Sequence, residues 1–147
     1  MVKSGDNVFL GEYSHTIDSK GRIIIPAKLR NNLGNNFIIT KGIDNCLFVY
    51  SEENFNNIIA KYKNLNDTKD KRIFMRLFLS SASRLEYDRQ GRINIPISLI
   101  DYASLTKNCK IIGVDDHLEI WNKDVWDEFI LNHSSDLSEI TDNLFKN

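Results

Sequence analysis

The sequence predicts an α+β fold made of two homologous β-rich halves, related as a pseudo-twofold tandem repeat. Three observations support this prediction. The nine residues DSKGRIIIP, Asp18 to Pro26, return seventy positions later as DRQGRINIP, Asp88 to Pro96. The two prolines that end these stretches are the only prolines in the chain. The same order of predicted strands and helices follows each stretch, and such self-similarity is typical of repeat architectures.

Each residue type in the shared pattern D-x-x-G-R-I-x-I-P has a local role. The aspartate can accept hydrogen bonds from backbone amides ahead of it, and the glycine can adopt the positive φ that a tight turn requires. The β-branched residues favour a short strand. Proline ends that strand because it has no N–H for the ladder, and it is favoured at the start of a helix. We therefore interpret six residues as structural turn residues: Asp18, Gly21, Pro26, Asp88, Gly91 and Pro96.

The first half is predicted to begin with a strand, a turn and a second strand. The alternation from Tyr13 to Ile17 predicts a strand that enters the Asp18 turn. Ile23 to Ile25 form the strand that leaves it. Residues 27–33 predict a two-turn helix, because two leucines lie four residues apart and a glycine follows.

A hairpin and two helices complete the first half. Residues 37–40 and 46–50 are apolar runs on either side of a polar turn, which predicts two paired strands. Ser51 can cap the next helix, whose apolar residues from Phe55 to Tyr62 recur at i, i+3, i+4 and i+7. After a polar break, the run from Ile73 to Leu79 is apolar nearly all round. It predicts a helix buried between the two halves or against another subunit.

The second half repeats this order. Its predicted strands cover 84–87, 93–95, 110–113 and 118–121, and its predicted helices cover 97–102, 125–130 and 137–144. The expected domain boundaries are a first repeat with its following helix at 9–63, a connecting helical region at 64–80, a second repeat with its following helix at 81–133, and an acidic C-terminal tail or helix at 134–147.

Composition indicates a soluble globular protein with an uneven distribution of charge. The chain has 147 residues and a formal net charge of -1. Two separate cysteines, no signal-like start and no long apolar run predict a reduced, cytoplasmic protein. Residues 61–92 hold nine Lys/Arg against four acids, whereas residues 114–147 hold two against nine. This distribution is compatible with an anionic partner if the fold places the two regions on different faces.

No motif in the sequence supports catalysis or a cofactor. His15, His117 and His133 are scattered, and no Cys/His cluster is present, so a zinc site is not predicted. The patterns G-x-S-x-G, G-x-x-x-x-G-K-[ST] and G-x-G-x-x-G are also absent from the sequence. We expect a protein that is not an enzyme, with no cofactor, no metal, no small-molecule substrate and no membrane association.

Basic residues gather near the two turns. Arg22 and Arg92 directly follow the turn glycines, and a planar guanidinium suits phosphate groups or guanine edges in double-stranded DNA. The alternative is that each arginine pairs with its own turn aspartate. Lys28 and Arg30, the two cations of the predicted helix at 27–33, either contact phosphates or lie on a solvated face of that helix. The predicted DNA-binding residues are Lys20, Arg22, Lys28, Arg30, Arg89 and Arg92.

The two turns differ in the charge around them. The first repeat carries Lys20, Arg22, Lys28 and Arg30, and the corresponding residues of the second are Gln90, Arg92, Ser98 and Ile100. We therefore expect the first repeat to supply the main DNA face, and loss of Arg22 to be more harmful than loss of Arg92.

The chain resembles the MraZ family of bacterial proteins. The resemblance rests on GEYSHTIDSKGRIIIPAKLR, KGIDNCLFVY, DRQGRINIP and IGVDDHLEIW with Trp126, and it covers roughly Phe9 to Phe129. It implies two AbrB-like swapped-hairpin units of β-barrel type with additional helices. It also implies a nucleoid-associated, sequence-specific DNA-binding transcriptional regulator of the division and cell-wall gene cluster. Such a protein would bind short direct repeats in its own promoter as a homo-oligomeric ring.

A different class of function is also compatible with the sequence. Similar swapped-hairpin folds occur in antitoxins that bind a partner protein. The chain could therefore be a non-catalytic protein-interaction module of antitoxin-like type, with the acidic end as its docking segment.

Overall fold

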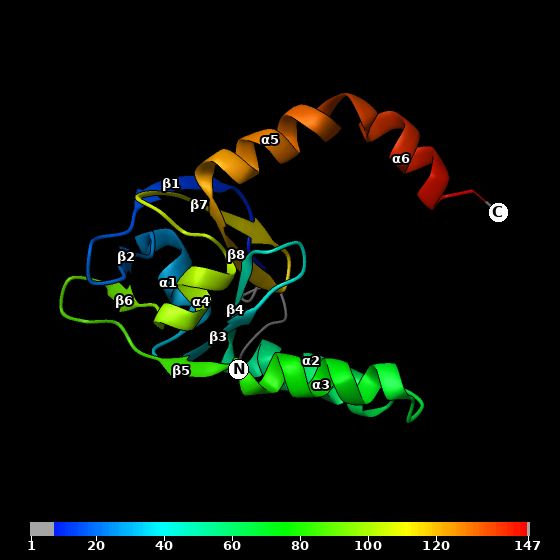
Figure 1. Ribbon diagram of the computed structural model, residues 1–147, viewed down its shortest axis with the longest axis horizontal. Helices are drawn as coiled ribbons and strands as arrows, with labels where there is room; N and C mark the ends of the chain where they lie inside the picture. Colours follow the sequence, from blue (N-terminus) through cyan, green and yellow to red (C-terminus); the bar gives the residue numbers. More distant parts are fainter. Residues whose placement is uncertain (1–7, 147) are drawn as a thin grey trace.

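A computed structural model of the protein describes residues 8–146. It contains a six-stranded antiparallel sheet, a separate two-stranded ribbon, and helices around both (Figure 1). The elements of the first half are β1 (Glu12–Thr16), β2 (Arg22–Ile24), α1 (Ala27–Leu33), β3 (Phe37–Lys41), β4 (Leu47–Ser51), α2 (Glu52–Lys63) and α3 (Lys69–Ser80). Those of the second half are β5 (Ser83–Leu85), β6 (Arg92–Asn94), α4 (Ile97–Tyr102), β7 (Asn108–Val114), β8 (His117–Asn122), α5 (Lys123–His133), the short 3-10 helix η2 (Ser134–Asp136) and α6 (Leu137–Leu144).

The large sheet is built from strands that the two halves exchange. Its strand order is β1-β7-β8-β4-β3-β5. If the halves are interchanged, so that β1 corresponds to β5, β3 to β7 and β4 to β8, this order reads the same in reverse. Each half therefore places its first strand against the other half, because β1 pairs with β7 and β5 pairs with β3. This exchange is a swapped-hairpin arrangement with a pseudo-twofold axis.

The predicted α+β class with two homologous tandem halves is confirmed. The barrel closure implied by the resemblance is corrected, since the six-stranded sheet is open. Closure would require the two edge strands to pair with each other. Here β1 and β5 are those edges, and they lie at opposite ends of the strand order.

The two-stranded ribbon of β2 and β6 lies on the pseudo-twofold axis. Ile23 pairs with Ile93, its own counterpart in the repeat. Across the sheet, the central pair of β4 and β8 places Phe48 opposite its counterpart Glu119. Equivalent positions can face each other in this way only at an axis, so the axis passes through both pairs.

One hydrophobic core is shared by both halves. It includes Ile23 and Ile25 from the first half and Ile93 and Ile95 from the second, all at most 2% exposed. The burial of residues 21–30 is repeated position by position in residues 91–100. The repeated motif therefore builds the same environment twice, and each copy packs against the other.

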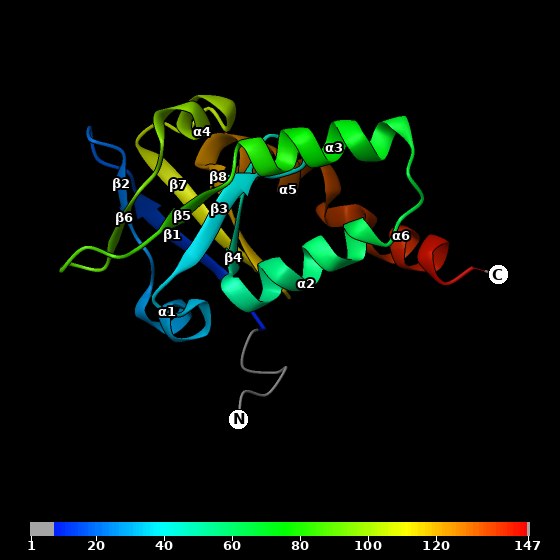
Figure 2. The same cartoon turned by 90° about the horizontal axis from the view of Figure 1, so that it is seen from below.

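A second cluster lies on the other side of the sheet and anchors the α2–α3 hairpin. Phe48, Tyr50, Phe78 and Trp121 are its large buried members. The hydroxyl of Thr40 on β3 donates to the carbonyl of Phe78 at 2.6 Å, which ties the end of α3 to the sheet. The hairpin extends away from the body of the molecule (Figure 2).

The apolar run at Ile73 to Leu79 is helical, as its composition predicts, but it is not buried between the halves. Phe78 is the buried residue of α3, whereas Ile73, Leu77 and Leu79 are 41%, 55% and 41% exposed. The reason is geometric, because α3 contacts α2 through the rings of Phe74 and Phe78 and meets the sheet near its C-terminal end. No helix in the part of the chain that the structure describes is long and apolar enough to cross a membrane.

His117 on β8 is held between two carboxylates within the second cluster. Its Nδ1 lies 2.7 Å from Asp116 and its Nε2 lies 2.9 Å from Glu119, and the side chain is 12% exposed. Burial alone would lower the pKa of His117. The hydrogen bonds to Glu119 and Asp116 outweigh burial and raise its pKa above the ordinary value.

The raised pKa predicts that the fold loses stability as the pH rises. The imidazolium binds its proton more tightly when the protein is folded, so its contribution is complete below the ordinary pKa of about 6.5. It is lost as the pH rises through the raised pKa of the folded state. Urea unfolding at about pH 6 and about pH 9 should show a lower free energy of unfolding at the higher pH. The His117→Gln variant should show a weaker dependence, and an unchanged dependence would contradict the prediction.

Candidate nucleic-acid interface

The turn between β1 and β2 is organised by its own aspartate. Oδ1 of Asp18 accepts hydrogen bonds from the backbone N–H groups of Lys20 and Arg22, each at 2.9 Å. Gly21 has a φ of 80° and donates its N–H to the carbonyl of Asp18 at 3.0 Å. The backbone bond from Arg22, followed by the side-chain bond from Arg22, holds the pKa of Asp18 below its ordinary value. The carboxylate is therefore charged at neutral pH.

The turn between β5 and β6 has the same construction. Oδ1 of Asp88 accepts from the backbone N–H groups of Gln90 and Arg92, each at 2.9 Å, and Gly91 has a φ of 78°. The same set of bonds lowers the pKa of Asp88. The two turns are thus local copies, because an aspartate and a glycine at this spacing satisfy the same backbone groups.

Each turn aspartate also orients the arginine at the start of the following strand. Nε of Arg22 donates to Oδ2 of Asp18 at 2.8 Å, and Nε of Arg92 donates to Asp88 at 2.7 Å. This is the pairing that the sequence left open as the alternative to DNA binding. It uses Nε alone, and within residues 8–146 the Nη groups of both arginines have no hydrogen-bond partner. The side chains are 30% and 26% exposed, so these donors remain available to a ligand.

The outer face of the ribbon carries side chains from both repeats. Ile23 and Ile93 point into the core, so their strand neighbours face outward. In register, Arg22 lies opposite Asn94 and Ile24 lies opposite Arg92. Ile24 is 41% exposed and Asn94 is exposed.

We call β2, β6 and their two turns, 18–21 and 88–91, the recognition ribbon. Sequence reasoning did not include Ile24 and Asn94 in the site. The sequence feature that could have identified them is alternation, because each directly follows a buried isoleucine on its strand and so faces outward. Both views place the ribbon at the end of the molecule away from the α2–α3 hairpin and α6 (Figures 1 and 2).

The structure distributes the other predicted cations unequally. Lys20 and Arg89 are exposed, one on each turn, and Lys28 is exposed on α1. Arg30 lies at the second turn, since a methyl group placed on Gly91 would lie 2.3 Å from its Nη1. Sequence position groups Arg30 with the first turn, and this assignment is therefore corrected. The charge difference that predicted the first repeat as the main DNA face changes with it.

This arrangement offers several guanidinium and ammonium donors on one ribbon. Among residues 8–146, no group of three or more histidine, cysteine or acidic side chains could hold a metal ion. Cys46 and Cys109 are buried, and burial raises the pKa of the Cys109 thiol to about 11, so it is not a thiolate at neutral pH. The ribbon can donate hydrogen bonds to an anionic or acceptor-rich surface.

Fold and site together define a tandem swapped-hairpin protein with two aspartate-held arginine turns on a shared ribbon. The family model described as "MraZ protein, putative antitoxin-like" matches this chain twice, over residues 8–77 and 78–147. The chain belongs to the MraZ family.

Two relatives carry the name transcriptional regulator MraZ. The protein from Thermoanaerobacter pseudethanolicus is 51% identical over 138 residues, which are 93% of this chain and 96% of the relative. The protein from Ligilactobacillus salivarius is 46% identical with the same coverage. The similarity therefore extends across both repeats and includes the recognition ribbon.

Proposed function

We propose that this protein is a transcriptional regulator that binds double-stranded DNA in a sequence-specific manner through the recognition ribbon. The observation that carries the proposal is the pair of arginines, Arg22 and Arg92. Each is held by a turn aspartate through Nε, and its Nη groups have no partner among the residues that the structure describes. The names of the relatives support the same class of function.

A two-stranded ribbon with arginine donors suits the major groove. This groove admits a two-stranded β-ribbon, and arginine can donate both Nη groups to the O6 and N7 atoms of guanine. The ion pair with aspartate restricts each arginine before binding, so less side-chain freedom is lost on contact. In this proposal Lys20 and Arg89, which are exposed on the two turns, contact phosphates, and such contacts contribute affinity without sequence information.

The proposed target is the division and cell-wall gene cluster. In this proposal the protein is cytoplasmic and nucleoid-associated, and it binds short direct repeats in its own promoter. Selecting bound fragments from the genome of the source organism would test this. Enrichment of fragments without a repeated motif would contradict the proposal.

We further propose that the protein forms a homo-oligomer, closed into a ring. Two projections of the molecule carry exposed apolar side chains, at Leu65, Ile73, Leu77 and Leu79 on the α2–α3 hairpin and at Leu131, Leu137, Leu144 and Phe145 on the α5–α6 arm. Their charges are opposite. Residues 61–76 carry six cations against two carboxylates, and residues 123–146 carry two cations against six. A hairpin of one copy and an arm of the next therefore complement each other, and such a head-to-tail contact closes into a ring when the rotation permits.

Light scattering is expected to report a mass above that of the monomer at micromolar concentration. Leu77→Asp should reduce that mass, because it places a carboxylate in the apolar contact. Leu10→Asp is the matched control, since Leu10 is also exposed but lies outside both projections. A purely monomeric wild-type protein, or equal effects of the two variants, would contradict the head-to-tail contact.

An antitoxin-like interaction module is the second candidate, favoured by the acidic and apolar α5–α6 arm. A mobility-shift assay at two salt concentrations separates the two functions. DNA binding through phosphate neutralisation weakens steeply with salt, whereas a protein that does not bind DNA gives no shift at either concentration.

A further inference from the structure

The swapped arrangement brings each turn against the short helix of the other repeat. The carbonyl of Gly21 accepts the N–H of Ile95 at 2.8 Å, and the carbonyl of Gly91 accepts the N–H of Ile25 at 3.2 Å. The strand ends at Ile25 and Ile95 lead directly into α1 and α4. Each turn is therefore supported by a helix of the other repeat: Gly21 meets Ile100, 79 positions later, and Gly91 meets Arg30, 61 positions earlier.

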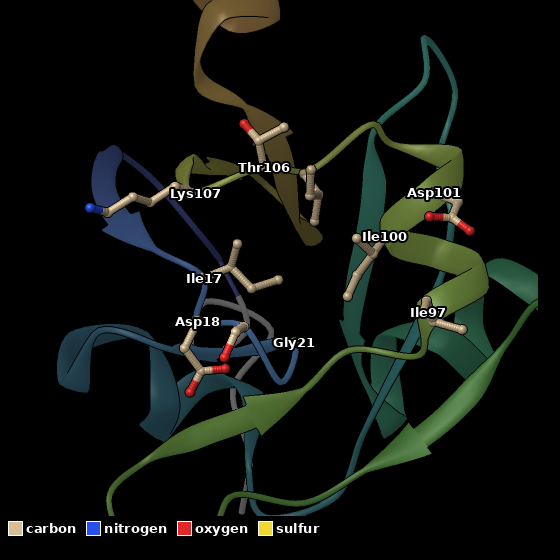
Figure 3. Close-up of a pocket in the computed structure, with 10 residues that line it drawn as sticks. Ile17, Asp18, Gly21, Ile97, Ile100, Asp101, Thr106 and Lys107 are labelled. Atoms are coloured by element: carbon tan, nitrogen blue, oxygen red, sulfur yellow. The ribbon is translucent and has the colours of Figure 1, made fainter.

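The residues that these helices place behind the turns are different. Ile100 of α4 lies behind the first turn, where a methyl group on Gly21 would be 3.0 Å from its Cδ1. A hollow of about 560 Å³ lies beside the Asp18 turn. Ile100 points into it from α4 (Figure 3). Arg30 occupies the equivalent position behind the second turn, with its guanidinium against Gly91. The second turn alone is thus backed by a cation.

The Arg30 guanidinium lacks the anionic partner that such a group normally has. Its Nε is buried without a hydrogen-bond partner, and no carboxylate within residues 8–146 forms an ion pair with it. The nearby hydroxyl of Tyr87 is also buried and has no hydrogen-bond partner in the described part of the chain. Burial raises the pKa of Tyr87 to about 12, and the positive charge of Arg30 opposes this rise. A half-buried cation without an anion is costly unless a ligand supplies the charge.

We infer that Arg30, from the first repeat, binds a DNA phosphate beside the second turn. This inference rests on the proposed DNA-binding function. The second turn then has Arg89, Arg92 and Arg30 for the duplex, whereas the first has Lys20 and Arg22. Each DNA-contacting end of the recognition ribbon is composed of both repeats, and the second end carries the greater charge.

The test is the salt dependence of binding to a promoter fragment, measured by fluorescence anisotropy. Arg30→Ile copies the residue found behind the first turn, so it is expected to fold. It should weaken binding about tenfold at low salt and reduce the slope of log K against log salt by about 0.9 per engaged subunit. Arg30→Lys should retain the wild-type slope, and Arg30→Gln should show the same reduction in slope as Arg30→Ile. Circular dichroism confirms that each variant is folded.

A gain-of-charge variant provides the matched control. Ile100→Arg places a guanidinium in the hollow behind the first turn and should increase the slope by a similar amount. An unchanged slope in folded Arg30→Ile, or equal slopes for the lysine and glutamine variants, would overturn the role of Arg30 while wild-type binding persists. If the wild-type protein itself does not bind duplex DNA, the proposed function is overturned and this inference with it.

Discussion

The double variant Arg22→Ala, Arg92→Ala is expected to lose nearly all preference for its promoter sequence. Each guanidinium that reads a guanine is worth about 1 to 3 kcal/mol, so the pair accounts for roughly a 30-fold to 20 000-fold change in affinity. The loss is increased by the aspartates that remain. Backbone hydrogen bonds keep Asp18 and Asp88 charged, and their carboxylates would then face phosphate groups without a cation.

Competition between promoter and unrelated duplexes measures this effect. The matched control is Lys41→Ala, Arg84→Ala, which removes the same number of positive charges from β3 and β5, outside both the recognition ribbon and the two projections. The control should weaken binding to both duplexes slightly and leave the preference intact. Equal loss of preference in the two double variants would show that bulk charge, and not the ribbon, determines recognition.

The sequence predicts the elements of this fold well because most of them have local causes. The D-x-x-G-R pattern predicts both turns, since each aspartate bonds to amides two and four residues ahead. The prolines predict where α1 and α4 begin. Strand β5 is less local, and it covers Ser83–Leu85 where residues 84–87 are predicted. Its boundary depends on pairing with β3, which belongs to the other half.

Local sequence patterns do not predict which elements pack against each other. An internal comparison aligns Arg30 with Ile100 and gives no indication that Arg30 meets Gly91, which is 61 positions later. Only the exchange of hairpins brings these residues together. The exposure of Ile73 and Leu77 has a similar origin. The composition of residues 73–79 predicts an apolar helix, but the position of the hairpin outside the shared core leaves this surface uncovered.

A fragment that contains one half of the chain is expected to have no folded monomeric state. In residues 8–81, strands β1, β2 and β4 would each lack the partner that the other half supplies, namely β7, β6 and β8. Ile23 and Ile25 would lose the opposite wall of the shared core. Removing even one large core side chain typically costs 2 to 5 kcal/mol, which is a large fraction of the stability of a domain this size.

The pseudo-twofold axis predicts what the fragment can do instead. Because Ile23 faces Ile93 and Phe48 faces Glu119 at equivalent positions, a second copy of the first half can replace the missing one without changing the topology. Circular dichroism and light scattering of residues 8–81 should therefore show an unfolded chain at low concentration and a folded dimer at high concentration. Mixing with residues 82–146 should restore a folded heterodimer, because Phe48 then lies opposite Glu119 as in the intact chain, instead of opposite a second Phe48. A fragment that folds cooperatively as a monomer would show that each repeat has a sufficient core of its own, and that the exchange of strands is not what holds the two halves together.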